Sequence, residues 1–295
     1  FGFNDPKINI IVSGKVGPGE KRNLGAKLAT GDVLAFLDDD SYPRNDWLKN
    51  ASDIFKDDNV FALGGTAITP EDADYLERMS GYLFESFIVS GKTTYRYKPE
   101  EKRLINDYPS VNLFVRKSSF EEVGGFPVEF WPGEDTKLCL DLVERYKNNF
   151  PYDPEVLVYH HRRKIFKPHL KQISRYGRHR GQFARIFPKT SRVPMYFAPS
   201  IFSLLLFSGL AMSLIFPIFY PLYFGGLLTY IGLLLFASYR VLRNKEKNTR
   251  AYFDFISGAF LTHIYYGINF LIGIMKKPKL KLKKYDEKTG NYVEG

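Results

Sequence analysis

The chain has 295 residues, of which 44% are hydrophobic and 16% aromatic, and its formal net charge is +10. This length allows one substantial globular domain and a smaller part. The charge suits nucleic acid, an anionic membrane surface or a phosphorylated substrate, so composition alone names no function. The single cysteine, Cys139, excludes an internal disulfide framework and fits a domain that faces a reducing compartment.

The first elements along the chain predict a βαβ unit. Residues 7–13 alternate and are β-branched, residues 20–30 have helical character, and residues 33–37 form a continuous apolar run. Strand, helix and buried strand in this order predict a parallel sheet covered by helices. In such sheets, ligands bind beyond the carboxyl ends of the strands.

Three consecutive acidic residues, Asp38, Asp39 and Asp40, directly follow this buried run. Adjacent carboxylates repel one another, so the run indicates a bound divalent cation. Hard oxygen ligands suit Mg²⁺ or Mn²⁺. The alternative is a solvated acidic turn, or a helix N-cap that leads into Trp47.

Further strands are predicted at residues 60–68 and 111–116. Glu134 and Asp135 then fall at a loop-to-helix junction, directly before the amphipathic run 136–146. An N-cap would explain acids at this place. The functional alternative is a general base at the floor of a cleft, where a carboxylate takes a proton from an acceptor hydroxyl.

The stretch from His160 to Arg185 is strongly basic and precedes the apolar part of the chain. Such charge can bind a diphosphate and an anionic bilayer, and we expect both. His160 and His161 are expected at a strand end, with side chains on opposite faces, so the pair is not expected to chelate one ion.

After about residue 190 the chain becomes apolar. The runs 198–216 and 218–239 are each near the length that crosses a bilayer, and they predict a membrane hairpin. The third run, 251–275, carries Asp254 and His263, whose presence in lipid demands a reason. Because both flanks of this third run are basic, the positive-inside rule favours a two-span hairpin followed by an interfacial or re-entrant segment.

We therefore expect three parts: a catalytic domain over 1–190, a membrane region over 191–280 and a basic, polar tail over 281–295. Nucleic acid is excluded as a partner, since no recognition motif occurs and the basic residues cluster beside apolar runs.

Several motifs, in order, resemble family 2 glycosyltransferases of the inverting GT-A type. Residues 17–25 look like the helix opening that precedes the family's metal motif, and residues 29–41, followed by Pro43 and Trp47, are similar to its DxD strand. Residues 133–135 resemble the motif that holds the catalytic base. Residues 172–176 resemble the QxxRW motif of processive polysaccharide synthases, with a tyrosine in place of the tryptophan.

The resemblance implies an α/β fold: a Rossmann-like GT-A domain with a mainly parallel sheet, followed by C-terminal transmembrane helices. It also implies that the family's first two strands, which hold the nucleotide base, are missing, so no base-binding aspartate is named. The membrane hairpin makes the chain look most like enzymes of exopolysaccharide or lipid-linked oligosaccharide assembly, including relatives of the succinoglycan glucosyltransferase.

The resemblance assigns a role to each candidate residue. Asp135 is the catalytic base. The metal is held by Asp40 and Asp38, and the donor is bound by Asp38, Asp39 and Arg22. The acceptor and diphosphate are bound by Glu134, Gln172, Arg175, Tyr176 and His160.

The implied activity is inverting transfer from a nucleotide-sugar donor to a lipid-linked or polysaccharide acceptor, with Mg²⁺ or Mn²⁺ as cofactor. The expected location is the cell membrane, with the catalytic domain in the cytoplasm and assembly-complex partners possible. The alternative is a catalytically inactive, transferase-like membrane scaffold in a polysaccharide assembly complex.

Overall fold

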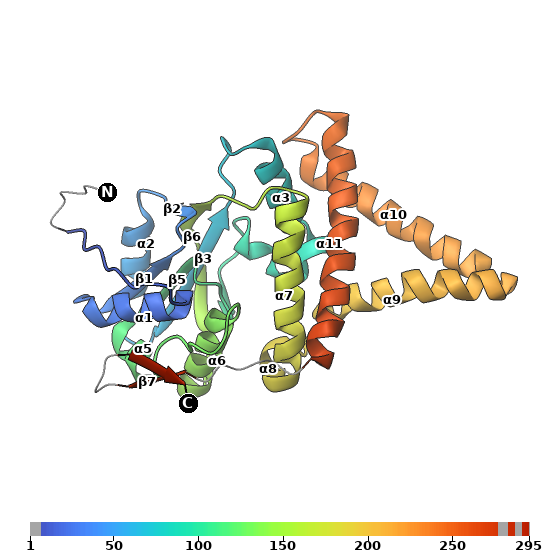
Figure 1. Ribbon diagram of the computed structural model, residues 1–295. Helices are drawn as coiled ribbons and strands as arrows, with labels where there is room; N and C mark the ends of the chain where they lie inside the picture. Colours follow the sequence, from blue (N-terminus) through green and yellow to red (C-terminus); the bar gives the residue numbers. More distant parts are fainter. Residues whose placement is uncertain (1–6, 277–282, 287–290, 295) are drawn as a thin grey trace.

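A computed structural model describes residues 7–276, 283–286 and 291–294 (Figure 1). The helices are α1 (Pro18–Leu28), α2 (Trp47–Ile54), α3 (Tyr75–Glu85), α4 (Phe87–Ser90), α5 (Lys117–Glu122), α6 (Glu134–Tyr146), α7 (Lys167–Ile186), α8 (Pro188–Ser191), α9 (Pro194–Ile215), α10 (Tyr220–Leu242) and α11 (Thr249–Met275), with the 3-10 helices η1 (Gly91–Arg96) and η2 (Pro217–Phe219). The strands are β1 (Val33–Leu37), β2 (Ser41–Pro43), β3 (Ala62–Ile68), β4 (Arg103–Ile105), β5 (Asn112–Arg116), β6 (Phe150–His160), β7 (Lys283–Asp286) and β8 (Asn291–Glu294).

The main sheet is mixed. Its strand order is β1-β5-β3-β6-β2, and β4 also pairs with β6. β3 and β6 are parallel, whereas the other described pairs are antiparallel, so the sheet is not mainly parallel over the described residues. The strands predicted at 60–68 and 111–116 are confirmed as β3 and β5. The α/β class is confirmed as well.

The strand predicted at residues 7–13 is wrong. These residues have no strand assignment, and β1 pairs with β5 rather than with them. Ile10 and Val12, on one face of the extended segment, are 64% and 91% exposed, and Ile11, on the other face, is 40% exposed, so neither face is buried. Alternating β-branched residues favour an extended backbone, but a strand also needs a partner for its amide and carbonyl groups.

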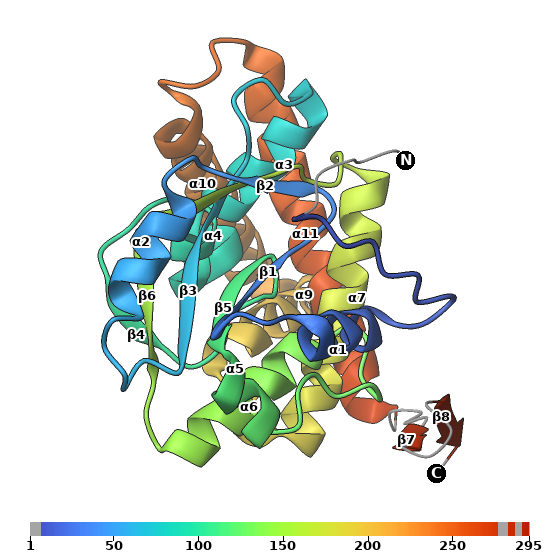
Figure 2. The same cartoon turned by 90° about the vertical axis from the view of Figure 1, so that its left-hand side faces the viewer.

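Helices cover both faces of the sheet, as alternation along the strands requires. On β5, Leu113 and Val115 point to the core cluster that also contains residues of α1, α5 and α6. Phe114 points the other way, to the cluster that contains Trp47 and Ala51 of α2. Figure 2 shows α1, α5 and α6 on one side of the sheet and α2 on the other. This sandwich holds the ends of β1 and β6 in fixed positions.

The C-terminal helices leave the domain in two directions. α9 and α10 project away from it as a hairpin, while α11 lies along α7, crosswise to the hairpin (Figure 1). The approach of α7 to α11 is close, because a Cβ atom on Gly177 would lie 2.5 Å from the carbonyl oxygen of Tyr266. Glycines at such contacts let helix backbones meet.

The aspartate and the histidine of the third apolar run contact other helices. Asp254 accepts a hydrogen bond from the Tyr75 hydroxyl at 2.9 Å. His263 contacts the Tyr230 hydroxyl at 2.7 Å and the Ile88 carbonyl oxygen at 2.9 Å. These contacts are the reason for polar groups in α11. Of the predicted tail over 281–295, only β7 and β8 lie within the described residues.

Candidate active site

A cavity of about 870 Å³ lies between the carboxyl-terminal end of β1, the start of α6, helix α7 and the first turns of α9. All of the predicted site residues line it: Arg22, Asp38, Asp39, Asp40, Glu134, Asp135, His160, Gln172, Arg175 and Tyr176. Residues from distant parts of the chain therefore converge on one site.

Asp38 and Asp40 are held by a tight turn between β1 and β2. The Ser41 amide donates to the Asp38 carbonyl oxygen at 3.1 Å, and the Ser41 hydroxyl donates to the same oxygen at 2.8 Å. β2 then pairs with β6, in a register that sets Ser41 opposite His160. This pairing is what brings His160 to Asp40. Asp39 is exposed at the cavity rim.

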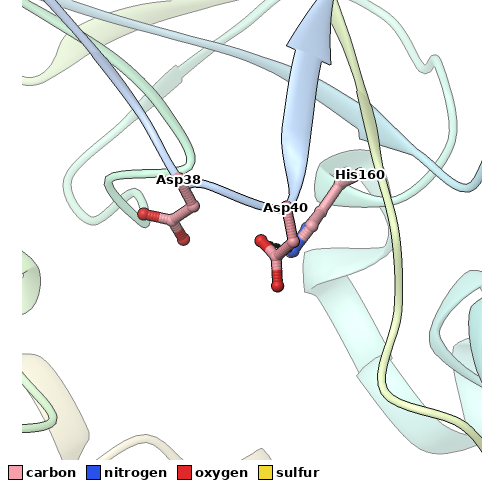
Figure 3. A group of neighbouring side chains, drawn as sticks. All are labelled: Asp38, Asp40 and His160. Atoms are coloured by element: carbon pink, nitrogen blue, oxygen red, sulfur yellow. Dashed lines mark ion pairs between the residues drawn. The ribbon is translucent and has the colours of Figure 1, made fainter. Parts of the chain in front are cut away.

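Asp38, Asp40 and His160 each offer one ligand atom, and these atoms lie within 4.8 Å of one another (Figure 3). Two carboxylates at this spacing fit a divalent cation that takes its other oxygen ligands from a diphosphate and water. Arg163 Nη2 lies 3.3 Å from Asp40 Oδ2, and His160 Nε2 lies 3.0 Å from Asp40 Oδ1. The charge of Arg163 thus offsets part of the acidic run, and the imidazole of His160 adds a hydrogen-bond partner for Asp40.

His160 is neutral and has a defined tautomer. Burial, together with the charge of Arg162, lowers its pKa. Arg162 Nη1 lies 2.7 Å from Nδ1 of His160, and a guanidinium can only donate. Nδ1 is therefore the acceptor, and Nε2 carries the proton and donates a hydrogen bond to Asp40 Oδ1. In this state His160 orients Asp40, and the oxygen atoms of Asp38 and Asp40 are the candidate ligands for a metal ion.

Arg22 joins the acidic run to the start of α6. Its Nη2 lies 2.6 Å from Asp38 Oδ1, and its Nη1 lies 3.0 Å from Glu134 Oε1. Glu134 is buried, and its second oxygen accepts from the Gly133 amide at 3.0 Å. Both carboxylate oxygens of Glu134 are thus engaged within the protein. Its predicted role in positioning the acceptor stays a prediction.

Asp135 occupies the first turn of α6, with its carboxylate at the cavity. Oδ1 accepts from the Thr136 amide at 2.7 Å, and Oδ2 accepts from the Ser110 amide at 3.4 Å. Burial, with the charges of Glu134 and Asp107 nearby, raises the pKa of Asp135 to about 7. A carboxylate with this pKa exchanges protons near neutral pH, as a general base must.

Gly133 allows this arrangement. Its φ is +123°, and an added Cβ would lie 1.8 Å from the imidazole of His179 on α7. Only glycine adopts this backbone and admits the ring. The glycine before the acidic pair therefore lets α7 pack closely against the start of α6.

The three predicted residues of α7 face the cavity. Gln172 Nε2 donates to the Tyr176 hydroxyl at 2.9 Å. The guanidinium of Arg175 lies 5.5 Å from the centre of the Trp131 ring, in a cation–π contact. Arg175 thus extends from α7 to the loop that precedes Asp135 and contacts it through Trp131.

Sequence reasoning missed a charged group behind Asp135. Asp107 lies between Arg180 Nη2 at 2.6 Å and Arg96 Nη2 at 3.4 Å. Burial alone would raise the pKa of Asp107, but the two guanidinium charges hold it below its usual value. The only signal in the sequence was the basic character of α7, because Arg96 and Asp107 lie in segments without a motif.

The model of the family described as "Glycosyl transferase family 2" matches residues 2–124. The chain carries a family 2 glycosyltransferase domain. The matched part of the domain includes the acidic run and ends before Asp135.

Curated relatives agree with this family 2 assignment. The pre-mycofactocin glycosyltransferase of Mycobacterium tuberculosis is 30% identical over 163 residues, which cover 55% of this chain and 33% of that protein. The glucosyl-dolichyl phosphate glucuronosyltransferase of Haloferax volcanii is 26% identical over 155 residues, which cover 50% of this chain and 47% of that protein. The chain therefore spans between a third and a half of the length of these relatives.

The fold of this family 2 glycosyltransferase domain is that of the GT-A enzymes. A solved structure, the mannosyltransferase PcManGT from Pyrobaculum calidifontis in complex with GDP-Man and Mn²⁺, aligns with a TM-score of 0.54 at 16% identity. The alignment covers 86% of this chain and 66% of that one. The predicted GT-A class is confirmed, whereas the narrower likeness to succinoglycan glucosyltransferases stays a prediction.

Proposed function

We propose that this protein transfers a sugar, with inversion, from a nucleotide-diphosphate sugar to a membrane-associated acceptor. The observation that carries the proposal is the single cavity that contains the acidic run, Asp135 and the first turns of α9. A donor site, a base and a route from the membrane thus share one space. The acceptor is a lipid-linked saccharide or a growing polysaccharide. The name of the Haloferax relative, which includes a dolichyl phosphate-linked sugar, supports the first of these.

Asp38 and Asp40 would hold a divalent cation, Mg²⁺ or Mn²⁺, which when bound neutralises charge on a departing diphosphate. The solved structure of the mannosyltransferase contains Mn²⁺, which supports this choice of cofactor. The protein's own cations, Arg22 and Arg163, stand beside the same carboxylates. When Asp38 and Asp40 coordinate the cation, the two guanidinium groups would be free to contact phosphate oxygens.

In the proposed reaction, Asp135 accepts the proton of an acceptor hydroxyl. The acceptor oxygen forms a bond to the anomeric carbon, and the bond from that carbon to the diphosphate oxygen breaks, with its electron pair leaving on the nucleoside diphosphate. Attack from the face opposite the leaving group inverts the anomeric centre. Arg175 and Gln172 of α7 would align the two substrates, which accounts for a large part of such catalysis.

The three apolar helices support a membrane location. Residues 194–215, 217–242 and 249–275 are long and apolar enough to cross a bilayer, with mean hydropathies of 1.9, 1.7 and 1.3. We propose that α9 and α10 span the cell membrane, because only 17% and 6% of their apolar windows are buried in the protein. α11 has 39% of its window buried and lies along the basic helix α7, so we place both at the cytoplasmic interface.

The test is a transfer assay on the full protein in membranes, with radiolabelled nucleotide sugars and with or without Mn²⁺. We expect metal-dependent transfer of label to lipid or polymer, and its loss in Asp135→Asn with donor binding retained. The absence of both transfer and hydrolysis with every donor would contradict the proposal and favour an inactive scaffold.

A further inference from the structure

Three buried polar atoms at one end of the cavity have no hydrogen-bond partner among the described residues. They are Nε of Arg96, Nε2 of His179 and the hydroxyl oxygen of Tyr266. All three residues line the cavity that contains Asp135. Buried polar groups without a partner are destabilising and rare in native proteins, so several around one cavity indicate a ligand that satisfies them.

The group formed by Arg96, Arg180 and Asp107 carries a net positive charge. Arg96 and Arg180 share one carboxylate, Asp107, so one guanidinium charge remains uncompensated within the group. His179 adds no charge, because burial and the charge of Arg180 lower its pKa to about 3. Arg180 also lies 5.0 Å from the ring centre of Tyr196. An anion with several acceptor oxygens fits such a set of donors.

The residues with unsatisfied atoms lie on other elements of the fold than the proposed donor site. The acidic run lies at the end of β1, with Arg22 and Arg163 beside it. The Arg96, Arg180 and Tyr266 group is formed by η1, α7 and α11, and Tyr196 belongs to the first turn of α9. Asp107 at its centre is hydrogen-bonded to Thr136, the neighbour of Asp135. The anion would therefore lie on the membrane side of Asp135.

The apolar lining next to this group of residues indicates that the anion carries a hydrocarbon chain. Met195 and Pro199 of α9 line the same cavity, and α9 continues as a candidate membrane span. A phosphate group held by Arg96 and Arg180 would thus have an apolar path for a hydrocarbon chain next to it. We propose that this group of residues is an acceptor subsite that binds the phosphate of a lipid phosphate.

This proposal rests on the proposed function and names its acceptor class. A lipid phosphate anchored here would hold its attached sugar, or its own terminal oxygen, toward Asp135. Arg96, Arg180 and Tyr266 are binding residues for the acceptor. The donor diphosphate is the competing source of a phosphate group, so the test measures both ligands.

Binding is measured by calorimetry on the full protein in nanodiscs, with farnesyl phosphate, farnesol and UDP with Mn²⁺ as probes. The key variant is Tyr266→Phe, which removes only a hydroxyl that has no partner in the described protein and so should not impair folding. We expect it to weaken farnesyl phosphate about tenfold, as loss of one hydrogen bond to a charged group does, and to leave UDP binding unchanged.

Two further variants complete the design. Arg185→Gln changes an exposed arginine of α7 that does not line the cavity, and should alter neither affinity. Asp40→Asn should weaken UDP with Mn²⁺ and leave farnesyl phosphate unchanged. Equal binding of farnesol and farnesyl phosphate, an unchanged affinity in Tyr266→Phe, or a parallel loss of UDP would each overturn the subsite.

The two proposals fail in different ways. If the protein transfers no sugar but shows the expected binding pattern, the subsite stands and the proposed function falls. If transfer is normal but Tyr266→Phe leaves the affinity for farnesyl phosphate unchanged, the subsite is contradicted and the proposed function is not.

Discussion

Arg22 Nη1 lies 3.0 Å from Glu134 Oε1, although the two residues are 112 positions apart in the chain. The same guanidinium binds Asp38 at 2.6 Å. One arginine thus joins the proposed metal motif to the first turn of α6, which also holds the proposed base. Because both Arg22 and Glu134 are largely buried, the pair is sensitive to the loss of either partner.

Arg22→Gln should lower the free energy of unfolding by about 3 kcal/mol, since it leaves the buried Glu134 carboxylate without its cation. Thermal melting in detergent measures the effect. Arg44→Gln is the matched control: Arg44 is more exposed and pairs with the surface acids Asp46 and Glu155, so its loss should cost about 1 kcal/mol or less. Equal losses in the two variants would contradict a linking role for Arg22.

Asp135 should control the pH dependence of transfer. Only its carboxylate form accepts a proton, so kcat/KM should rise with pH and level off above about 7, following the raised pKa. Asp135→Asn should remove this limb and lower transfer by about 10²-fold or more. Asp141→Asn, on the same helix and paired with Lys137 alone among the described residues, should keep both rate and profile. A profile without the acid limb in the wild-type protein would count against Asp135.

The same raised pKa predicts a stability effect. The pKa of Asp135 is about 7 in the folded protein, whereas the ordinary aspartate pKa of 3.8 applies in the unfolded chain, so the folded state binds more protons between these values. Its stabilising contribution is complete below the unfolded pKa and is lost as pH rises through the folded one. Asp135→Asn should therefore melt at a higher temperature than the wild type at about pH 8 and equally at about pH 4. A lower melting temperature at the higher pH would be the contrary result.

Metal binding should depend on the carboxylates and not on the imidazole. Asp40→Asn should weaken Mn²⁺ binding by about tenfold or more, because it removes a charged oxygen ligand. His160→Gln should have a much smaller effect, since its amide can still donate to Asp40 as Nε2 does at 3.0 Å. Manganese EPR titration measures both affinities. Similar losses in the two variants would show that His160 is itself a ligand.

The proposed topology is accessible to cysteine labelling. Cys139 is buried and is the one cysteine of the chain, so an introduced cysteine dominates the signal. Ile218→Cys places a thiol at the tip of the hairpin, where the side chain is 83% exposed, and Lys247→Cys places one between α10 and α11. An impermeant maleimide should reach the first from outside the cell and the second only from the cytoplasm. Labelling of both from one side would contradict a spanning hairpin.

Local sequence was sufficient for the single elements. An apolar run followed by acids predicted β1 and the residues after it, and two acids at a loop-to-helix junction predicted Asp135 as a candidate base. The lengths of the apolar runs identified α9, α10 and α11. These features depend on neighbours in the chain, through strand burial, helix periodicity and bilayer thickness.

Only the tertiary structure decided which residues meet. The pairing of β2 with β6 brings His160 to Asp40. Arg22 forms an ion pair with Glu134, and Asp107 forms ion pairs with Arg96 and Arg180. In the tertiary structure residues 7–13 form no strand, although their alternating pattern predicts one. Pairings over long separations depend on the packing of the whole sheet and of α7 against α11, and no local pattern encodes them. The sequence by itself determined the family and the candidate base and metal ligands, while the fold decided how charge is distributed around them and where the cavity meets the candidate membrane-spanning helices.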